Sequence, residues 1–122
     1  MLFRSIDVIL RYGNRRYDCS AKVDTGSEVC LFEREIADIL EIDVESGYRE
    51  YFGTLTSRLI AYQHEIELET LGLQFQTKVY FAEDYGLPRN LLGRNGWLQQ
   101  VKLAVVDYEE TLYLSAYEPL IN

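Results

Sequence analysis

One short run of residues could carry a reactive carboxylate: Asp24-Thr25-Gly26-Ser27, directly after the apolar Val23. Asp, Gly and Ser are also ordinary turn residues, so the run alone is equally consistent with a structural turn between strands. A glycine at position 26 would let a backbone, from this chain or from a substrate, come close to the Asp24 carboxylate. The hydroxyl groups of Thr25 and Ser27 could either fix the loop or bond to that carboxylate.

Two other segments could take part in a functional site because of where they occur along the chain. Residues 90–97 read NLLGRNGW, which in isolation is typical of a buried strand that ends at a helix. Residues 48–68 contain two extended runs that meet near a small and polar cluster at 53–57. Most hairpins of this kind only pack, but one that lies between two chemical motifs has the form of a lid over a site.

The elements that must position these segments are mostly short strands, because apolar residues alternate or run together over short stretches bounded by turn signals. Gly13-Asn14 and Leu71-Gly72 are predicted turns between strands, and residues 83–90, which include Pro88, form a predicted loop. The predicted strands are 3–12, 16–23, 29–32, 48–53, 59–68, 73–82, 101–106 and 111–114.

Residues 33–40 change to a helical period and begin with acidic side chains, which favour a helix N-terminus. The apolar residues expected on one face of this helix are Phe32, Ile36, Ile39 and Leu40. A second short helix is predicted to follow Leu91-Leu92-Gly93 and to run through Leu98. The sequence therefore predicts a mainly β protein with one or two short helices.

Composition sets the outer limits. The chain has 122 residues, with 48% hydrophobic and 26% charged residues, which is typical of one soluble globular domain covering 1–122. The net charge of −8 disfavours a nucleic-acid partner. No apolar run approaches the ~20 residues that span a bilayer, and the N-terminal run reads as a strand and not as a signal peptide. The two cysteines, Cys19 and Cys30, are expected to be reduced thiols in a cytoplasmic protein.

Taken in order, VDTGS at 23–27, a hairpin with a glycine near its tip, and NLLGRNGW at 90–97 resemble a retropepsin-like aspartic protease. This family is the single-domain branch of the pepsin superfamily, and the chain resembles its bacterial and retrotransposon-type members. The resemblance runs from about residue 16 to residue 114. It implies an all-β fold, namely a closed β-barrel with a flap hairpin and one or two short helices. It also implies a homodimeric endopeptidase that cleaves a peptide or protein substrate and needs no metal or other cofactor.

The resemblance assigns roles residue by residue. Asp24 would be the catalytic acid, Thr25 would bond its twin across the two-fold axis, and Gly26 would admit the substrate. The hydroxyl of Ser27 would support the carboxylate. Further supporting residues would be Glu28, Leu91, Leu92, Gly93 and Arg94, where the hydrophobic-hydrophobic-Gly segment crosses behind the catalytic loop and Arg94 begins the polar pair completed by Asn95. The flap and substrate-binding residues would be Phe52, Gly53, Thr54 and Leu55.

The chain departs from the viral pattern in three places. Its flap has only Gly53 near the tip instead of several glycines, so the flap boundaries stay open. A helix follows the catalytic loop, as in many non-viral relatives. The acidic pair that often follows the viral motif is here Glu28-Val29, which keeps only the first acidic position.

Elementary chemistry agrees with the resemblance. Peptide hydrolysis without a metal or a nucleophilic side chain requires an activated water and an acid for the leaving group. Two neighbouring carboxylates supply both, because their like charges force them to share one proton and to titrate as a unit. The chain contains a single Asp-Thr-Gly, so a symmetric dimer is needed to bring two copies of Asp24 together.

Other readings have less support. A Ser-His-Asp or Cys-His site would require His64, the only histidine, which is expected to be a surface or hydrogen-bonded residue of a strand. A zinc site would need Cys19, Cys30 and His64 with a carboxylate, and their spacing matches no ligand pattern. Cys30 is expected to be a small core residue, while Tyr51 or Phe52 could line a cleft or simply pack.

Two alternatives remain. A dimeric peptide-binding or assembly module could keep the fold and cleave little, and a structural β domain would leave the pairing of motifs unexplained. The protease hypothesis makes two structural predictions: residues 21–32 should pack against residues 91–97, and Glu28 should lie within ion-pair reach of Arg94.

Overall fold

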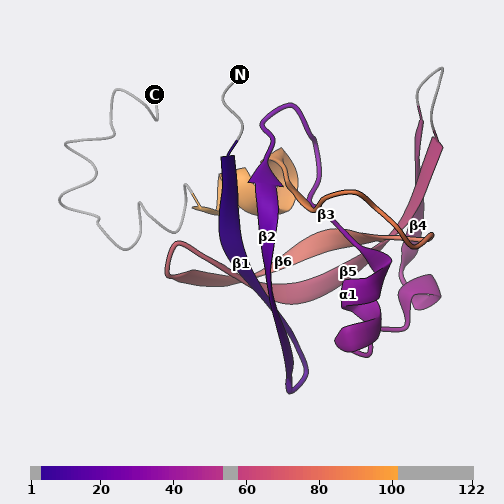
Figure 1. The fold of residues 1–122 in the computed structure, drawn as a ribbon, viewed down its shortest axis with the longest axis horizontal. Coiled ribbons are helices and arrows are strands. Elements are labelled where there is room, and N and C mark those ends of the chain that lie inside the picture. Colours follow the sequence, from indigo (N-terminus) through magenta and orange to yellow (C-terminus); the bar gives the residue numbers. More distant parts are fainter. Residues whose placement is uncertain (1–3, 54–57, 102–122) are drawn as a thin grey trace.

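The computed structural model describes residues 4–53 and 58–101 of the chain. Their arrangement in space is shown in Figure 1. In chain order, the elements are β1 (Arg4–Tyr12), β2 (Arg15–Val23), β3 (Leu31–Phe32), α1 (Arg34–Ile39), η1 (Val44–Ser46), β4 (Tyr48–Gly53), β5 (Arg58–Thr70), β6 (Leu73–Ala82), β7 (Leu91–Leu92) and η2 (Arg94–Leu98).

The predicted turns at 13–14 and 71–72 are confirmed. β1 and β2 pair antiparallel from Arg4↔Val23 to Tyr12↔Arg15, so Gly13 and Asn14 form the connection. β5 and β6 pair antiparallel up to Thr70↔Leu73. Their turn has both central residues at positive φ, 53° at Leu71 and 78° at Gly72, as a tight hairpin connection requires.

The seven strands form one sheet in the order β1-β2-β7-β3-β6-β5-β4. β1 also pairs with β5 through Ile9↔Glu69, Leu10↔Leu68 and Arg11↔Glu67, so the first six strands of that order close into a ring of pairings. Figure 1 shows the β1–β2 hairpin crossing the β5–β6 pair. β4 lies outside the ring and pairs only with β5 among the described strands. The architecture is mainly β with short helices, as predicted.

The core fills the space enclosed by these elements. The largest side chains with less than 2% exposure come from five strands and from α1 and its C-terminal end. Both the sheet and the helix therefore contribute to one core. These side chains include Leu10, Phe32, Ile36, Leu40, Ile66, Leu68, Phe81 and Leu92. At the far side of this interior, the buried Trp97 of η2 donates its indole N–H to Thr70 Oγ1 at 2.9 Å. The β7–η2 segment is therefore part of the core and not a surface loop.

α1 forms where the helical period begins, but one predicted core residue is wrong. Ile36, Ala37 and Leu40 are buried, whereas the Ile39 side chain is 45% exposed. The buried residues centre on a direction between Ile36 and Ala37, and a rotation of about 100° per residue turns Ile39 away from it. Phe32 is in the core, but it belongs to β3 and not to the helix.

The second predicted helix is only partly regular. η2 contains two residues with non-helical backbone angles, Asn95 at ψ 131° and Gly96 at φ 92°. Residues 99–101 are helical, so Val101 begins no strand. The rest of the predicted hairpin at 101–106 and 111–114 lies outside the described residues. Within the described ranges, no helix is long and apolar enough to cross a membrane.

Candidate active site

The loop after β2 holds Asp24 in a tight turn. The Asp24 backbone N–H donates to Leu92 O at 2.9 Å, which ties the residue to β7. Its carboxylate Oδ1 accepts the N–H of Gly26 at 2.9 Å, and its carbonyl accepts the N–H of Ser27 at 3.0 Å. These bonds fix the orientation of a carboxylate that stays partly exposed. Thr25 and Gly26, the next two predicted site residues, are exposed at the end of the loop.

β7 passes between the strands on either side of this loop. It runs parallel to β2 through Lys22↔Leu91 and Val23↔Leu92, and antiparallel to β3 through Leu31↔Leu91. Beyond β7, two further backbone bonds reach the loop itself, from Arg94 N to Ser27 O at 2.9 Å and from Asn95 N to Glu28 O at 2.8 Å. The predicted packing of residues 21–32 against 91–97 is thereby confirmed.

Gly93 lies at the closest point of this crossing. A Cβ atom at position 93 would be 2.2 Å from Val29 O and 2.7 Å from Ser27 O, both backbone atoms that cannot turn aside. Glycine is therefore required here by close backbone approach. The neighbouring Leu92 is 1% exposed and anchors the crossing in the core, whereas Leu91 is half-buried on the opposite face.

Two predicted side-chain contacts do not form. The Ser27 hydroxyl donates to Val29 O at 2.8 Å, because the turn directs it into its own loop and not toward the Asp24 carboxylate. Of the two roles considered for this hydroxyl, fixing the loop is therefore the one observed. Within the described residues, none of the ion pairs within 4.0 Å joins Glu28 to Arg94. The backbones of these two residues are adjacent, but both side chains point to solvent.

A small group of apolar residues, called here the apolar wall, adjoins the crossing. It comprises the buried Leu31, Ala61 and Tyr80 and the partly buried Val29, Phe52, Leu59, Leu87 and Leu91. Of the predicted flap residues, Phe52 packs edge-on against Tyr80 with ring centroids 5.3 Å apart. Gly53 ends β4 and is exposed. Thr54 and Leu55 lie outside the described residues. The wall therefore connects the strand pair that carries Phe52 with the β7 crossing.

Asn90, the first residue of NLLGRNGW, has a structural role that residue types alone did not predict. Its amide Nδ2 donates to Ser20 O and to Glu33 Oε2, each at 3.0 Å, while its Oδ1 accepts the Glu33 N–H at 2.9 Å. Its carbonyl accepts the Lys22 N–H at 2.8 Å. A 5% exposed amide with these partners joins β2, β7 and the start of α1. The sequence signal for this role was a polar amide directly before a Leu-Leu pair that was expected to be buried.

Polar contacts also join α1 to the loop 83–90. Arg34 Nη1 donates to Glu45 Oε2 at 2.6 Å and to Glu83 O at 2.8 Å, and its guanidinium lies over the Tyr85 ring, 5.5 Å from the centroid. The Arg34 hydrogen bond lowers the pKa of the Glu45 carboxyl. Tyr85 in turn donates to Asp38 Oδ2 at 2.6 Å, and this bond is the main reason why the pKa of the Tyr85 hydroxyl is raised.

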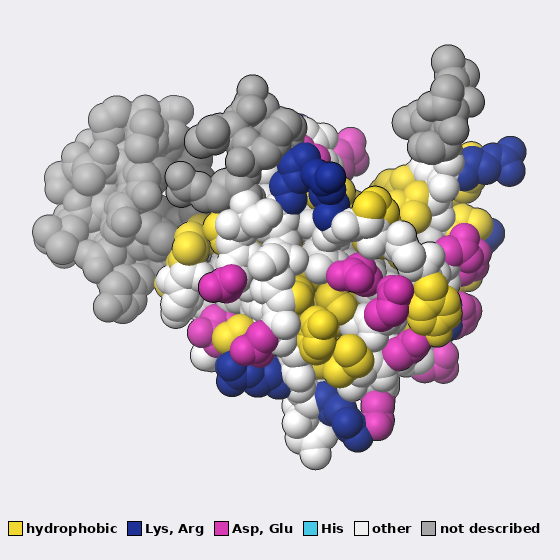
Figure 2. All heavy atoms as spheres, viewed as in Figure 1, with side chains coloured by type: hydrophobic (Ala, Val, Ile, Leu, Met, Phe, Trp, Pro, Cys, Tyr) yellow, Lys and Arg dark blue, Asp and Glu magenta, His cyan; other side chains and the backbone are white. Residues whose placement is uncertain are grey.

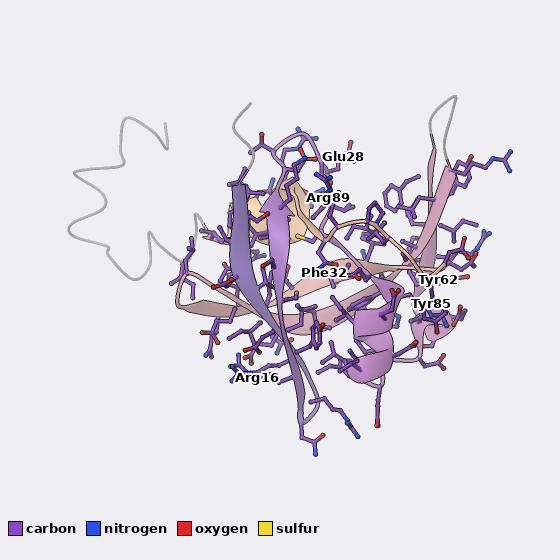
Figure 3. The ribbon with its side chains drawn as sticks, in the orientation of Figure 1. Arg16, Glu28, Phe32, Tyr62, Tyr85 and Arg89 are labelled. Atoms are coloured by element: carbon purple, nitrogen blue, oxygen red, sulfur yellow. The ribbon has the colours of Figure 1, made fainter. Side chains whose placement is uncertain are left out.

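Figure 3 places Tyr85 beside α1, which agrees with its bond to Asp38. Tyr62 donates to Glu83 Oε2 at 2.8 Å, a hydrogen bond that raises the pKa of the Tyr62 hydroxyl. The Glu83 N–H also donates to Ile60 O at 2.8 Å. The start of the loop is therefore tied to β5 as well as to α1.

The residues considered for other chemistries have structural roles. His64 Nε2 lies 2.8 Å from Val44 O, and its ring packs against Phe81, which agrees with a hydrogen-bonded histidine. Cys30 is fully buried, and burial raises the pKa of its thiol to about 12, although the Gly93 N–H bonds to the sulfur. The pKa of the Cys19 thiol is also raised to about 12, chiefly by burial. Both cysteines are free thiols and weak nucleophiles at neutral pH.

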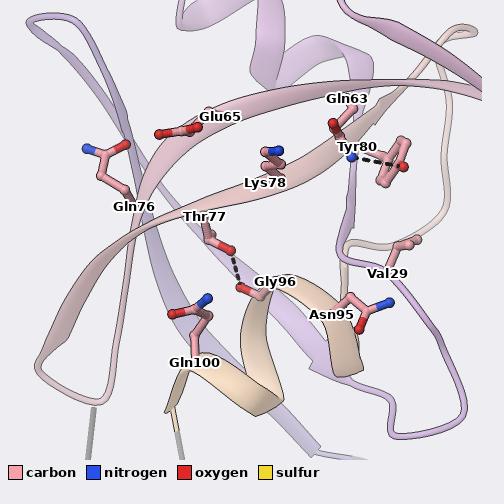
Figure 4. A pocket seen from close by; sticks show the side chains of 10 residues that line it. All are labelled: Val29, Gln63, Glu65, Gln76, Thr77, Lys78, Tyr80, Asn95, Gly96 and Gln100. Atoms are coloured by element: carbon pink, nitrogen blue, oxygen red, sulfur yellow. Dashed lines mark hydrogen bonds between the residues drawn. The ribbon is translucent and has the colours of Figure 1, made fainter. Parts of the chain in front are cut away.

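A hollow of about 390 Å³ lies where β5, β6 and η2 meet (Figure 4). Its lining includes Glu65 and Lys78, so it has no single sign of charge. Within it, Thr77 Oγ1 donates to Gly96 O at 2.8 Å, which holds η2 against β6. Figure 2 shows a small group of Lys and Arg side chains in the region where Figure 3 places Arg89 and Glu28.

Comparisons with known proteins add a likeness in fold. No family model and no curated protein matches the chain. Among solved structures, it is similar to the retroviral EIAV protease complexed with the inhibitor HBY-793, with a TM-score of 0.62 and 16% sequence identity. The likeness covers 81% of this chain and 88% of that one. The chain therefore has the retropepsin-like fold that the sequence predicted.

Proposed function

We propose that this protein is a homodimeric aspartic endopeptidase that hydrolyses peptide bonds with a water held between Asp24 of one subunit and Asp24 of its partner. One observation carries the proposal: the backbone of the Asp-Thr-Gly turn is tied to β7, and the Asp24 carboxylate is bonded by the Gly26 N–H of its own loop while it stays partly exposed. The retropepsin-like fold supports the same conclusion.

Two carboxylates at one site supply both catalytic functions. Their like charges favour a state with one shared proton, in which one group is a base and the other an acid. The base removes a proton from the water as it attacks the peptide carbonyl carbon, and the acid gives its proton to the leaving amine. The chemistry requires no metal and no cofactor.

The second carboxylate comes from a second copy of the chain. The chain has one Asp-Thr-Gly, and a two-fold axis beside its exposed end would place two Asp24 side chains together. Thr25 is exposed at this end of the loop, where its hydroxyl would meet its symmetry mate. Gly26 would leave room for the substrate backbone. The assembly proposed is therefore a homodimer with one site at its axis.

The substrate is an extended peptide segment bound by backbone hydrogen bonds, in the manner of strand addition. It would lie over the part of the apolar wall formed by Val29, Leu87 and Leu91. The β4–β5 hairpin would form the flap, with Phe52 where the wall meets the flap and with Gly53, Thr54 and Leu55 as its other substrate-binding residues. Apolar substrate side chains would contact Val29 and Phe52. The two free thiols suit a reducing compartment, and we place the protein in the cytoplasm.

The test is incubation with a peptide library between about pH 4 and 7, with and without a statine-type inhibitor, because a carboxylate pair works in this range. Cleavage that the inhibitor blocks, and that Asp24→Asn abolishes in a folded protein, is the expected result. Binding of peptides with no cleavage at any pH would identify a silent peptide-binding module instead. Cleavage that persists in Asp24→Asn would exclude the proposed mechanism.

A further inference from the structure

We propose that Arg34 is a positioning residue for the substrate: it holds the loop 83–90 against α1 so that Leu87 stays in the apolar wall. This inference rests on the proposed function, because that function makes the wall part of the substrate site. Arg34 itself lies on α1 and is not one of the wall residues, so it acts through Leu87.

The first half of the loop is tied to α1 and η1 through one guanidinium. Arg34 Nη1 bridges Glu83 O at 2.8 Å and Glu45 Oε2 at 2.6 Å, and Nη2 adds a bond to Glu45 Oε1 at 3.1 Å. The guanidinium also packs on Tyr85. The Arg34 side chain is 18% exposed and its bond to Glu83 O is partly buried, whereas the Glu45 side chain is 49% exposed, so the bond to the loop is shielded from water more than the ion pair is.

Neighbouring side chains of α1 complete the attachment. Asp38 accepts the Tyr85 hydroxyl at 2.6 Å, and Glu35 Oε2 accepts the Gly86 N–H at 3.2 Å. Gly86 has φ 89°, the left-handed conformation that favours glycine, so the chain turns sharply just before Leu87. Three of the four loop residues that precede Leu87, namely Glu83, Tyr85 and Gly86, are therefore attached to α1.

The second half of the loop is tied down independently by Asn90, through its bonds to Ser20 and Glu33. Only residues 87–89 lie between the two attachments. Leu87 packs in the apolar wall with Leu91, which pairs with Lys22 and Leu31 directly beside the Asp24 turn. The position of Leu87 relative to Asp24 is therefore set by Arg34 from one end and by Asn90 from the other.

The chemistry of this arrangement favours a peptide with a large apolar side chain next to the cleaved bond, because Leu87 would form one side of its pocket. Loss of a single methylene contact in such a pocket changes specificity by about 10- to 200-fold. Lysine could not replace Arg34 in full, since an ammonium group lacks the second nitrogen that completes the forked pair with Glu45 and the planar group that packs on Tyr85.

The experiment compares Arg34→Met and Arg34→Lys with the matched control Arg16→Met. Arg16 also forms a forked pair, with Asp18 at 2.8 and 3.0 Å, but it is exposed and distant in sequence from α1 and the loop. For a peptide with a large apolar residue beside the cleaved bond, both Arg34 variants should raise KM about tenfold. Their kcat should change by less than about threefold, and Arg16→Met should leave both constants unchanged.

Two measurements identify the route of the effect. Arg34→Met should speed hydrogen exchange of the Gly86 amide in the free protein. In a double-mutant cycle with Leu87→Ala, the second substitution should add little to the first. Unchanged KM despite faster exchange, or fully additive effects, would overturn the inference. If Arg34→Met fails to fold, Tyr85→Phe removes one contact of the same attachment and should show a smaller shift in the same direction.

Failure of the proposed protease function can be distinguished from failure of the positioning role of Arg34. A wild-type protein that cleaves no peptide contradicts the protease assignment but still permits measurement of Kd for the statine-type inhibitor. In that case, weaker inhibitor binding by Arg34→Met than by Arg16→Met would support the positioning role, and equal binding would contradict it.

Discussion

The two sides of the proposed substrate site are held in very different ways. On one side, the Asp24 turn, β7 and the loop 83–90 are joined by backbone bonds across the crossing and by the buried amide of Asn90. On the other side, β4 is the edge strand of the sheet, and its described residues are exposed or half-buried. Its main contact beyond the β5 ladder is Phe52 on Tyr80.

This difference separates two requirements of a cleft enzyme. A reactive carboxylate needs a fixed position, which buried and mutually supporting bonds provide. Entry of an extended substrate needs an element that opens at low cost, and segments with few buried contacts open locally most easily. In the described part of the chain, Asp24 is surrounded by buried and mutually supporting bonds, whereas β4 is a segment with few buried contacts.

The largest effect is expected at the centre of the fixed side. Gly93→Ala would place a Cβ atom 2.2 Å from Val29 O, so the crossing behind Asp24 must separate. We expect a loss of about 3 kcal/mol in the free energy of unfolding, the upper range for overpacking. Chemical denaturation measures it.

Gly13→Ala is the matched control, because Gly13 has φ 61° but nothing within 4 Å of an added Cβ. It carries only the backbone strain of about 1 kcal/mol. Equal losses in the two variants would mean that close approach at Gly93 does not hold the crossing together.

A smaller effect is expected where the fixed side is tied by side chains. Asn90→Ala leaves the Glu33 N–H and Ser20 O without their buried partner, at a cost of about 2 kcal/mol. Asn95→Ala, at an exposed position five residues later, should stay within about 0.5 kcal/mol of wild type. Thermal unfolding of both variants checks the contrast, and similar melting temperatures would argue against a structural role for the Asn90 amide.

The smallest effect on stability is expected at β4. Phe52→Ala removes the edge-on contact with Tyr80, which contributes about 1 kcal/mol to the free energy of unfolding. For each kcal/mol of stability lost, however, Phe52→Ala should lower kcat/KM more than Asn90→Ala does. Tyr51→Ala, on the opposite and exposed face of the strand, should change neither quantity appreciably. If Phe52→Ala proved more destabilising than Asn90→Ala, β4 would belong to the fixed part of the molecule.

The sequence predicted the strands and the crossing because both depend on local signals. Alternating apolar residues defined β4 and β6 to their end residues, and Leu91-Leu92-Gly93 indicated a buried segment that a backbone approaches closely. Residue pattern and resemblance together were sufficient for the fold.

Side-chain partners were less predictable because they are set by tertiary contacts. Arg34 meets Glu83 across 49 positions of sequence, and Asn90 meets Ser20 across 70, distances that no local pattern reports. The residue types left two acceptors open for the Ser27 hydroxyl for a related reason. Its direction depends on how the turn closes on Val29, and residue types alone do not determine that closure.

The central claim, that one site is built from two copies of Asp24, is tested most directly by mixing subunits. Asp24→Asn removes the titratable group with little change in shape, so the variant chain should fold and pair with wild type. After exchange of equal amounts, random pairing leaves about a quarter of the dimers with two aspartates. Activity should fall to about that fraction of a wild-type sample at the same total concentration. A fall to only about half would show that each chain works alone and would contradict the shared site.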